Sequence, residues 1–191
     1  MSVSRIKALL AATVLSAAGL VAGVVPAANA APAKAASCFN YGTGGYIGAK
    51  YHQLGGPNGG LGCPTSWEYD IGPRRGRAQN FERGNISWTP DTGGENTVAA
   101  WHQGRTIFLN WGPTNPFHYD GWLVRMDRNG YHVGQYEYRN GWAGIGAQRG
   151  QTTFYNQPAG WYRFIVEGCD INGSHTCRQG WTNPVTFYFP G

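Results

Sequence analysis

Short apolar runs separated by glycine-rich and polar turns dominate the chain from residue 38 onward. Apolar residues alternate with polar ones in several runs, for example at Trp122, Val124 and Met126, as expected for strands with one buried face. We predict strands at 106–111, 121–126, 132–138, 152–154, 161–168 and 185–189. No long stretch keeps a helical period, so the pattern predicts a mainly β fold, with a β-sandwich over residues 96–191.

The pattern before residue 95 has a different character. Three apolar residues bracket a turn at 83–85 and predict a β-hairpin over residues 78–88: Phe81, Ile86 and Trp88. The i, i+4, i+7 spacing of Ile47, Tyr51 and Leu54 permits one short helix. Small and polar residues collect at 92–96, so we place a domain boundary there, between residues 38–95 and residues 96–191.

The N-terminus has the features of a secretory signal peptide. Arg5 and Lys7 precede an apolar run over residues 8–25, and the small residues Ala28 and Ala30 flank Asn29. We expect residues 1–30 to be removed and residues 31–37 to form a flexible lead-in. A membrane anchor is the alternative, but the run is rich in alanine and glycine and short for a span. The sequence therefore predicts a secreted protein, extracellular or wall-associated, with no membrane insertion after cleavage.

Four cysteines follow the predicted signal peptide: Cys38, Cys63, Cys169 and Cys177. An even number in an exported chain predicts two disulfides, and three pairings are possible. We favour Cys38–Cys63 and Cys169–Cys177, because each pair then lies within one predicted domain. Each closure stabilises a small domain by about 2–4 kcal/mol. No CxxC spacing occurs and the histidines do not cluster with the cysteines, so we expect no metal and no cofactor.

The charge balance is mildly basic. The chain has fifteen Lys and Arg against ten Asp and Glu, and removal of Arg5 and Lys7 leaves thirteen against ten. Such a small excess does not indicate a nucleic-acid partner. The same small excess is compatible with weak attraction to anionic wall polymers.

A spaced motif runs through the first predicted domain. Its anchors are Gly45-Tyr46-Ile47, Leu54-Gly55-Gly56, Gly60-Leu61-Gly62-Cys63-Pro64-Thr65, Glu68, Gln79-Asn80-Phe81 and Gly84-Asn85-Ile86-Ser87-Trp88. This motif resembles one LGFP repeat, a module of exported actinobacterial proteins, and the resemblance implies association with the cell wall. Cys63 stands where the family commonly has Phe. Only one copy of the motif is found, so this chain lacks the avidity that several linked copies would give.

The second predicted domain is similar to fibronectin type III and related immunoglobulin-like sandwiches. Trp111 would be the core Trp of an early strand, and Trp122 with Val124 would lie on the next. Phe154 with Tyr162 would form the tyrosine corner. The resemblance implies a spacer or a protein-binding surface.

Known catalytic motifs are absent from the sequence: there is no HExxH, no G-x-S-x-G and no P-loop. Glu68 and Glu82 are the candidate pair for glycoside hydrolysis, which needs two carboxylates about 5–9 Å apart. We favour a simpler interpretation, in which Glu68 pairs with an arginine and Glu82 is solvated. We therefore expect a protein that is not an enzyme, with a small wall glycan hydrolase as an alternative.

Aromatic residues are dense before residue 102, and they carry the functional hypothesis. Trp67 and Tyr69 alternate in a polar turn region, and sugar faces stack on such rings. We predict ligand-binding residues Trp67, Tyr69, Tyr51, Gln53 and Gln79, although a small module also needs aromatic residues for its core. The expected function is non-catalytic association with the cell envelope by binding wall polysaccharide or peptidoglycan. An extracellular protein-binding module, such as an inhibitor, adhesin or toxin component, is the alternative.

Overall fold

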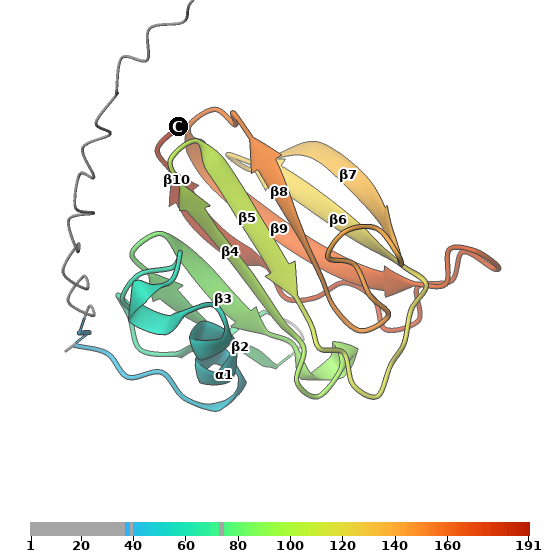
Figure 1. Cartoon of the computed structure of the whole chain (residues 1–191), viewed down its shortest axis with the longest axis horizontal. Helices are drawn as coiled ribbons and strands as arrows, with labels where there is room; N and C mark the ends of the chain where they lie inside the picture. The colour runs from blue at the N-terminus through green and yellow to red at the C-terminus, as the bar shows by residue number, and fades with distance from the viewer. Residues whose placement is uncertain (1–36, 39, 73–74) are drawn as a thin grey trace, which may run out of the picture. The chain divides into compact units, whose positions relative to one another are not determined.

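Two antiparallel sheets and one α-helix build the fold in the computed structural model (Figure 1). The structure describes residues 37–38, 40–72 and 75–191. The predicted signal peptide at 1–30 and most of the lead-in therefore lie outside the described residues. The observed elements confirm the mainly β fold class.

The first sheet has six strands in the order β1-β2-β3-β4-β5-β8. They are β1 (Tyr69–Ile71), β2 (Gly76–Phe81), β3 (Gly84–Trp88), β4 (Thr97–Gln103), β5 (Thr106–Trp111) and β8 (Gly150–Tyr155). The second sheet has the order β10-β9-β6-β7. It consists of β10 (Val185–Phe189), β9 (Gly160–Cys169), β6 (Gly121–Arg128) and β7 (Tyr131–Arg139). The helix α1 spans Gly45–Gln53, and short 3-10 turns span Gly56–Asn58 and Pro90–Thr92.

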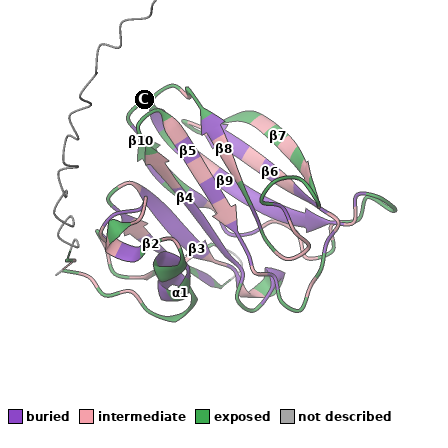
Figure 2. Cartoon of the chain, viewed as in Figure 1, coloured by how far each residue is buried: buried purple, intermediate pink, exposed green. Residues whose placement is uncertain are grey.

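Both faces of β4 are buried, and each face contributes to a different core. Val98 and Ala100 pack with residues of the second sheet in the sandwich core. Ala99 points to the opposite face, where it joins Ile47 of α1 and Ile86 of β3. Figure 2 shows the first part of β4 as buried, while β7 is largely exposed or half-buried. The first sheet is thus the middle of three layers, with α1 on one face and the second sheet on the other.

The predicted domain boundary falls between two strands that pair. β3 and β4 are antiparallel neighbours from Gly84↔Trp101 to Trp88↔Thr97. Strands from residues 38–95 and residues 96–191 therefore share one sheet, and Lys34–Gly191 forms one compact unit. A separate fibronectin III-like domain is not confirmed, because β5, which carries Trp111, belongs to the same sheet as β1–β4.

Local patterns predicted most elements. The hairpin and the short helix are present, and all six predicted strands are observed as β5 to β10. The sequence pattern did not predict β1 or β4. The first four residues of β4 are all buried, so the strand lacks the alternation of a half-exposed strand.

The two predicted disulfides are confirmed. Cys38 and Cys63 are bonded at 2.03 Å and tie the segment before α1 to the loop that leads into β1. Cys169 and Cys177 are bonded at 2.04 Å and close the loop that follows β9. All four cysteines are therefore oxidised.

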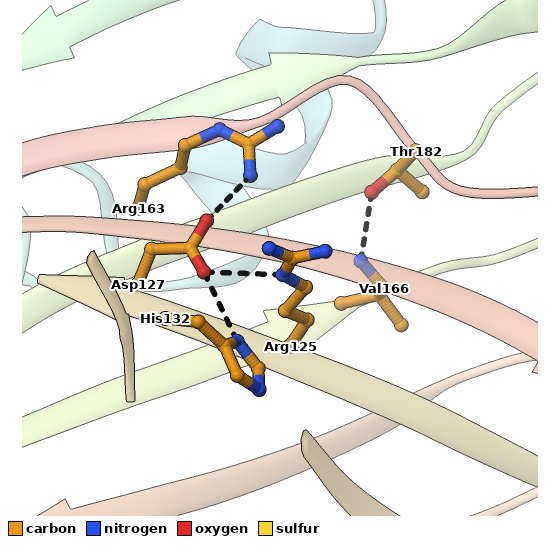
Figure 3. Close-up of polar contacts among 6 residues, drawn as sticks. All are labelled: Arg125, Asp127, His132, Arg163, Val166 and Thr182. Carbon is orange, nitrogen blue, oxygen red and sulfur yellow. Dashed lines mark hydrogen bonds and ion pairs between the residues drawn. The ribbon is translucent and has the colours of Figure 1, made fainter. Parts of the chain in front are cut away.

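The outer face of the second sheet carries a carboxylate beside two arginines and a histidine (Figure 3). Asp127 of β6 is 7% exposed. Its two oxygens accept hydrogen bonds from Arg125 at 3.1 Å and Arg163 at 2.9 Å, and His132 Nδ1 lies 3.3 Å away. Burial by itself raises the pKa of Asp127, but the hydrogen bonds outweigh burial and lower it below the usual value.

Asp127 is expected to stabilise the fold at neutral pH and to lose this effect in acid. A depressed folded pKa means that the contribution is present above the unfolded pKa of about 4 and disappears as the pH falls through the folded pKa. We predict that Asp127→Asn lowers the free energy of unfolding by about 1–3 kcal/mol at pH 7, and by much less at pH 2. Urea unfolding at both pH values measures this difference.

The matched control is Glu137→Gln, which breaks an exposed ion pair with Arg139 on β7. Exposed pairs contribute little, so this control is expected to change the free energy by less than about 1 kcal/mol. A loss for Asp127→Asn that is the same at pH 7 and pH 2 would contradict the electrostatic explanation.

The shared middle sheet predicts one cooperative unfolding transition. Ile86 and Ile107 are both fully buried, Ile86 on the α1 side and Ile107 in the sandwich core. Either isoleucine changed to alanine is expected to lower the free energy of unfolding by about 2–5 kcal/mol and to shift the whole transition. Urea unfolding followed by circular dichroism and by tryptophan fluorescence measures both shifts. Two transitions, of which Ile86→Ala moves only one, would show that the cores unfold separately.

Candidate functional site

A cleft of about 360 Å³ opens at the N-terminal end of α1. We call it the aromatic cleft, and its lining residues are Gly44, Gly45, Tyr46, Ile47, Glu68, Arg77 and Trp88. The helix itself explains why Tyr46 is available. Ile47 and Tyr51 are one turn apart and face the core, so the neighbouring Tyr46 points away from it and is 45% exposed.

Two aromatic rings flank this cleft. The ring centroids of Tyr46 and Trp88 are 5.6 Å apart, with an interplanar angle of 31°. Trp88 is the last residue of β3, and its Nε1 donates a hydrogen bond of 2.9 Å to the carbonyl of Gly94. The sheet and this bond hold the indole in place, so the cleft has one fixed ring and one exposed ring.

Opposite charges lie beside the rings. Nε of Arg77 is 3.6 Å from a carboxylate oxygen of Glu68 and 3.5 Å from one of Asp70. An Arg77 amino group also donates to the backbone carbonyl of Glu68 at 3.3 Å. The cleft therefore combines apolar ring faces with a carboxylate and a guanidinium, groups that can accept hydrogen bonds from hydroxyls and donate to them.

Trp67 precedes Glu68 in the sequence and lies outside the aromatic cleft. Its side chain is 64% exposed. The ring makes an edge contact with Tyr41, at 5.6 Å between centroids, and a Cβ at Gly42 would lie 3.7 Å from it. Trp67 therefore offers an exposed ring that is not part of the aromatic cleft.

Tyr69 lies on the other face of the β1–β2 ribbon. In the register, Tyr69 is opposite Ala78 and Asp70 is opposite Arg77. Since side chains alternate between faces, Tyr69 leaves the ribbon away from Arg77. Its hydroxyl donates to Asn80 at 3.1 Å. The structure therefore does not bring Tyr69 into the aromatic cleft.

Two of the predicted ligand residues are structural in their contacts. Tyr51 is 3% exposed and stacks on Phe81, with 4.9 Å between centroids. Gln79 is fully buried, and its Nε2 donates bonds of 2.9 Å to the carbonyls of Gly42 and Ser66. Both side chains support the loops around the cleft and offer a ligand no exposed surface. Gln53 is exposed and lines two other cavities, beside the C-terminal half of α1.

The two candidate catalytic carboxylates lie in different clefts. Glu68 lines the aromatic cleft, whereas Glu82 lines a groove of about 440 Å³ with His102 and Trp161. Glu82 is also 3.6 Å from Arg83. Glycoside hydrolysis needs both carboxylates on one scissile bond, and the structure does not bring these two together.

Potential metal ligands gather at one position among the described residues, where atoms of Glu167, Cys169 and Cys177 lie within 4.8 Å of one another. The two sulfurs are bonded to each other. Protein sites bind zinc through thiolates, so in the oxidised chain this group offers a metal only the Glu167 carboxylate.

Sequence reasoning missed the residues that shape the aromatic cleft. In the sequence, Trp88 looks like a core residue, because it lies two positions after the apolar Ile86 and so on the same face of the strand. Arg77 follows Arg74 and Arg75 and looks like part of a solvated basic loop, whereas the structure places it on β2. Tyr46 has a usable signal, since it precedes Ile47 and so lies beside the apolar stripe of α1 rather than within it.

Residues 61–114 match the LGFP repeat family. The match includes β1 to β5, so it extends well past residue 95, where the motif was expected to end. No curated protein matches the chain. Within the described residues, none of the helices has the length and hydrophobicity to cross a bilayer. The LGFP similarity and the two disulfides indicate an extracellular protein of the exported actinobacterial type.

Proposed function

We propose that this is a secreted, non-catalytic protein that binds a cell-wall glycan through the aromatic cleft. The observation that carries the proposal is the pairing of Tyr46 with Trp88 beside the Arg77–Glu68 ion pair. The partner would be a wall polysaccharide or peptidoglycan. The similarity to the LGFP repeat supports a place at the cell envelope.

The chemistry of the aromatic cleft suits a sugar ring. The C–H face of a sugar is apolar and packs on an aromatic ring, while its hydroxyls need donors and acceptors at the rim. Trp88 and Tyr46 provide the ring faces, and Glu68 and Arg77 provide the polar groups. Trp67 offers a second stacking surface for a longer glycan.

Binding without catalysis fits the placement of the carboxylates. Glu68 and Glu82 line different clefts, so they do not form the pair that glycoside hydrolysis uses. Glu68 and Asp70 both lie beside Arg77, which makes them members of one ion-pair cluster. The proposal therefore gives Glu68 a role in holding Arg77 and in bonding hydroxyls.

The test is co-sedimentation of the purified protein with insoluble peptidoglycan and with arabinogalactan-peptidoglycan. We predict that Tyr46→Ala and Trp67→Ala each weaken retention about three- to tenfold, because each removes a stacking ring. Both side chains are exposed, so the unfolding midpoint is expected to change little. The matched control is Tyr155→Ala, an exposed tyrosine on β8 outside the aromatic cleft, which should be retained like the unchanged protein.

Two results would overturn the proposal. Retention that is unchanged in Tyr46→Ala, or absent in the unchanged protein, would rule out glycan binding at the aromatic cleft. Release of soluble sugar during the incubation would contradict the non-catalytic part and support a small wall hydrolase.

An extracellular protein-binding module is the second candidate, and Trp142 favours it. This residue lies between β7 and β8 and is 54% exposed. It lines a cleft of about 440 Å³ with Trp101, Phe108 and Tyr138. Exposed tryptophans of this kind are frequent anchors in protein interfaces. This candidate would be favoured if every variant kept its glycan retention while Trp142→Ala no longer bound a protein partner.

A further inference from the structure

Lys50 is a buried cation whose hydrogen bond goes to a neutral amide. It lies on α1, is 3% exposed, and its Nζ donates to Asn110 Oδ1 of β5 at 2.8 Å. Burial lowers the pKa of Lys50 to about 8, and the charge of Arg149 acts in the same direction. Buried charges are normally paired, so an ammonium with this environment needs an explanation.

No carboxylate of the described residues forms an ion pair with Lys50 or with Arg149. Both cations line one cavity of about 250 Å³ between α1, the end of β5 and the start of β8. We call its polar lining the donor pocket, and it consists of Lys50, Gln53, Asn110, Arg149 and Gln151. Asn110 Oδ1 accepts the hydrogen bond from Lys50, so the amide nitrogen of Asn110 remains as a donor.

Glycines give the donor pocket its shape. Gly112 has a φ of 88°, and a Cβ there would lie 2.3 Å from the carbonyl oxygen of Gln148. Its absence lets the segment before β8 approach the end of β5, which brings Arg149 to the cavity. Gly144 has a φ of 77°, and its Cβ would lie 2.7 Å from Gln151 Cγ. The cavity is thus built by close backbone approach around the two cations.

The charges around the pocket indicate which anion fits. An adjoining cleft of about 200 Å³ shares Lys50, Gln53 and Arg149 with the donor pocket and is also lined by Glu95. The two cations and this carboxylate give a local net charge of +1 at pH 7. One carboxylate neutralises that charge, whereas a phosphate monoester would leave a negative excess.

We infer that the donor pocket binds the carboxylate group of an acidic ligand, held by the Lys50 ammonium and the Arg149 guanidinium. The carboxylate belongs either to a uronic acid or to the C-terminus of a peptide, because both present the same planar oxyanion. The amides of Gln53 and Gln151 line the rim and can bond the atoms beside the carboxylate. The inference does not depend on glycan binding at the aromatic cleft.

Lys50 can be observed directly in the unchanged protein. The chain has three lysines, and Lys7 lies in the predicted signal peptide. A protein without residues 1–30 therefore gives two lysine side-chain NMR resonances, from Lys34 and Lys50. We expect acetate, glucuronate and alanylalanine to shift the Lys50 resonance in a saturable way and to raise the pKa of Lys50, because a bound anion favours the charged amine. Lys34 and sodium chloride at equal ionic strength are the internal and external controls.

The pH dependence follows from the same group. Carboxylate affinity is expected to fall as the pH rises through about 8, where free Lys50 loses its proton. Tyr46, Glu95 and Arg149 are the other titratable groups that line the two cavities.

Variants distinguish specific carboxylate binding in the donor pocket from a general electrostatic attraction of anions to the protein. Arg149→Gln is expected to weaken carboxylate binding about tenfold or more, because it removes a charge-assisted hydrogen bond. The matched control is Arg105→Gln, which removes the same charge from an exposed arginine in the turn between β4 and β5. Lys50→Met keeps the apolar stem and removes the ammonium, so it is expected to abolish binding while the circular dichroism spectrum stays unchanged.

The outcomes are distinct from those of the glycan test. A Lys50 resonance that responds to none of the carboxylates beyond the chloride control would overturn the inference and leave Lys50 as a tie between α1 and β5. Tighter binding of inorganic phosphate than of any carboxylate would overturn the assignment of the ligand class. Preference for glucuronate or for alanylalanine identifies the source of the carboxylate. Trp67→Ala tests glycan binding alone, because Trp67 lines neither cavity beside Lys50, whereas acetate binding tests only the donor pocket.

Discussion

The pairing of β3 with β4 is the interaction on which the rest of the structure depends. It continues the hairpin of the LGFP-like segment into the strands of the sandwich, so that one sheet serves two cores. Small residues make this possible, because Ala99 and Ala100 leave room for α1 on one face and for the second sheet on the other. The pairing adds Ala99 to the apolar surface that α1 covers, and it brings β5 and β8, which carry Asn110 and Gln151 of the donor pocket, into the same sheet. The Cys38–Cys63 disulfide adds to this by fixing the chain that enters α1.

Helix α1 is the element that both candidate sites share. Tyr46 and Lys50 are four residues apart and therefore lie on the same side of the helix. Tyr46 lines the aromatic cleft and also the cleft that adjoins the donor pocket, so the two sites are neighbours along one helix. The chemistry of the two sites differs: ring faces and an ion pair at the first, and two cations with amide donors at the second. A ligand that presents both a sugar ring and a carboxylate would match this combination.

Local patterns were sufficient for most of the fold. Alternation predicted β5 to β10, and helical spacing predicted α1, because periodicity reports which residues of one element face the same side. The even number of cysteines and their spacing predicted both disulfides. The pattern did not reveal β4, since a strand covered on both faces has no alternation, and it did not show that this strand joins the two predicted domains. Strand pairing between β3 and β4 depends on backbone groups, which carry no signature in the side-chain sequence.

For the candidate sites, too, the sequence determined some features and the tertiary structure determined others. The sequence alone determined the supply of aromatic residues, the mild positive charge and the place of Trp67 in a polar turn region. The tertiary structure decided the rest. It buried Tyr51 and Gln79, brought Trp88 beside Tyr46, placed Glu68 and Glu82 in different clefts, and enclosed Lys50 near Arg149. The physical reason is that burial and charge pairing are properties of surfaces brought together from distant parts of the chain, whereas a sequence pattern describes only one element at a time.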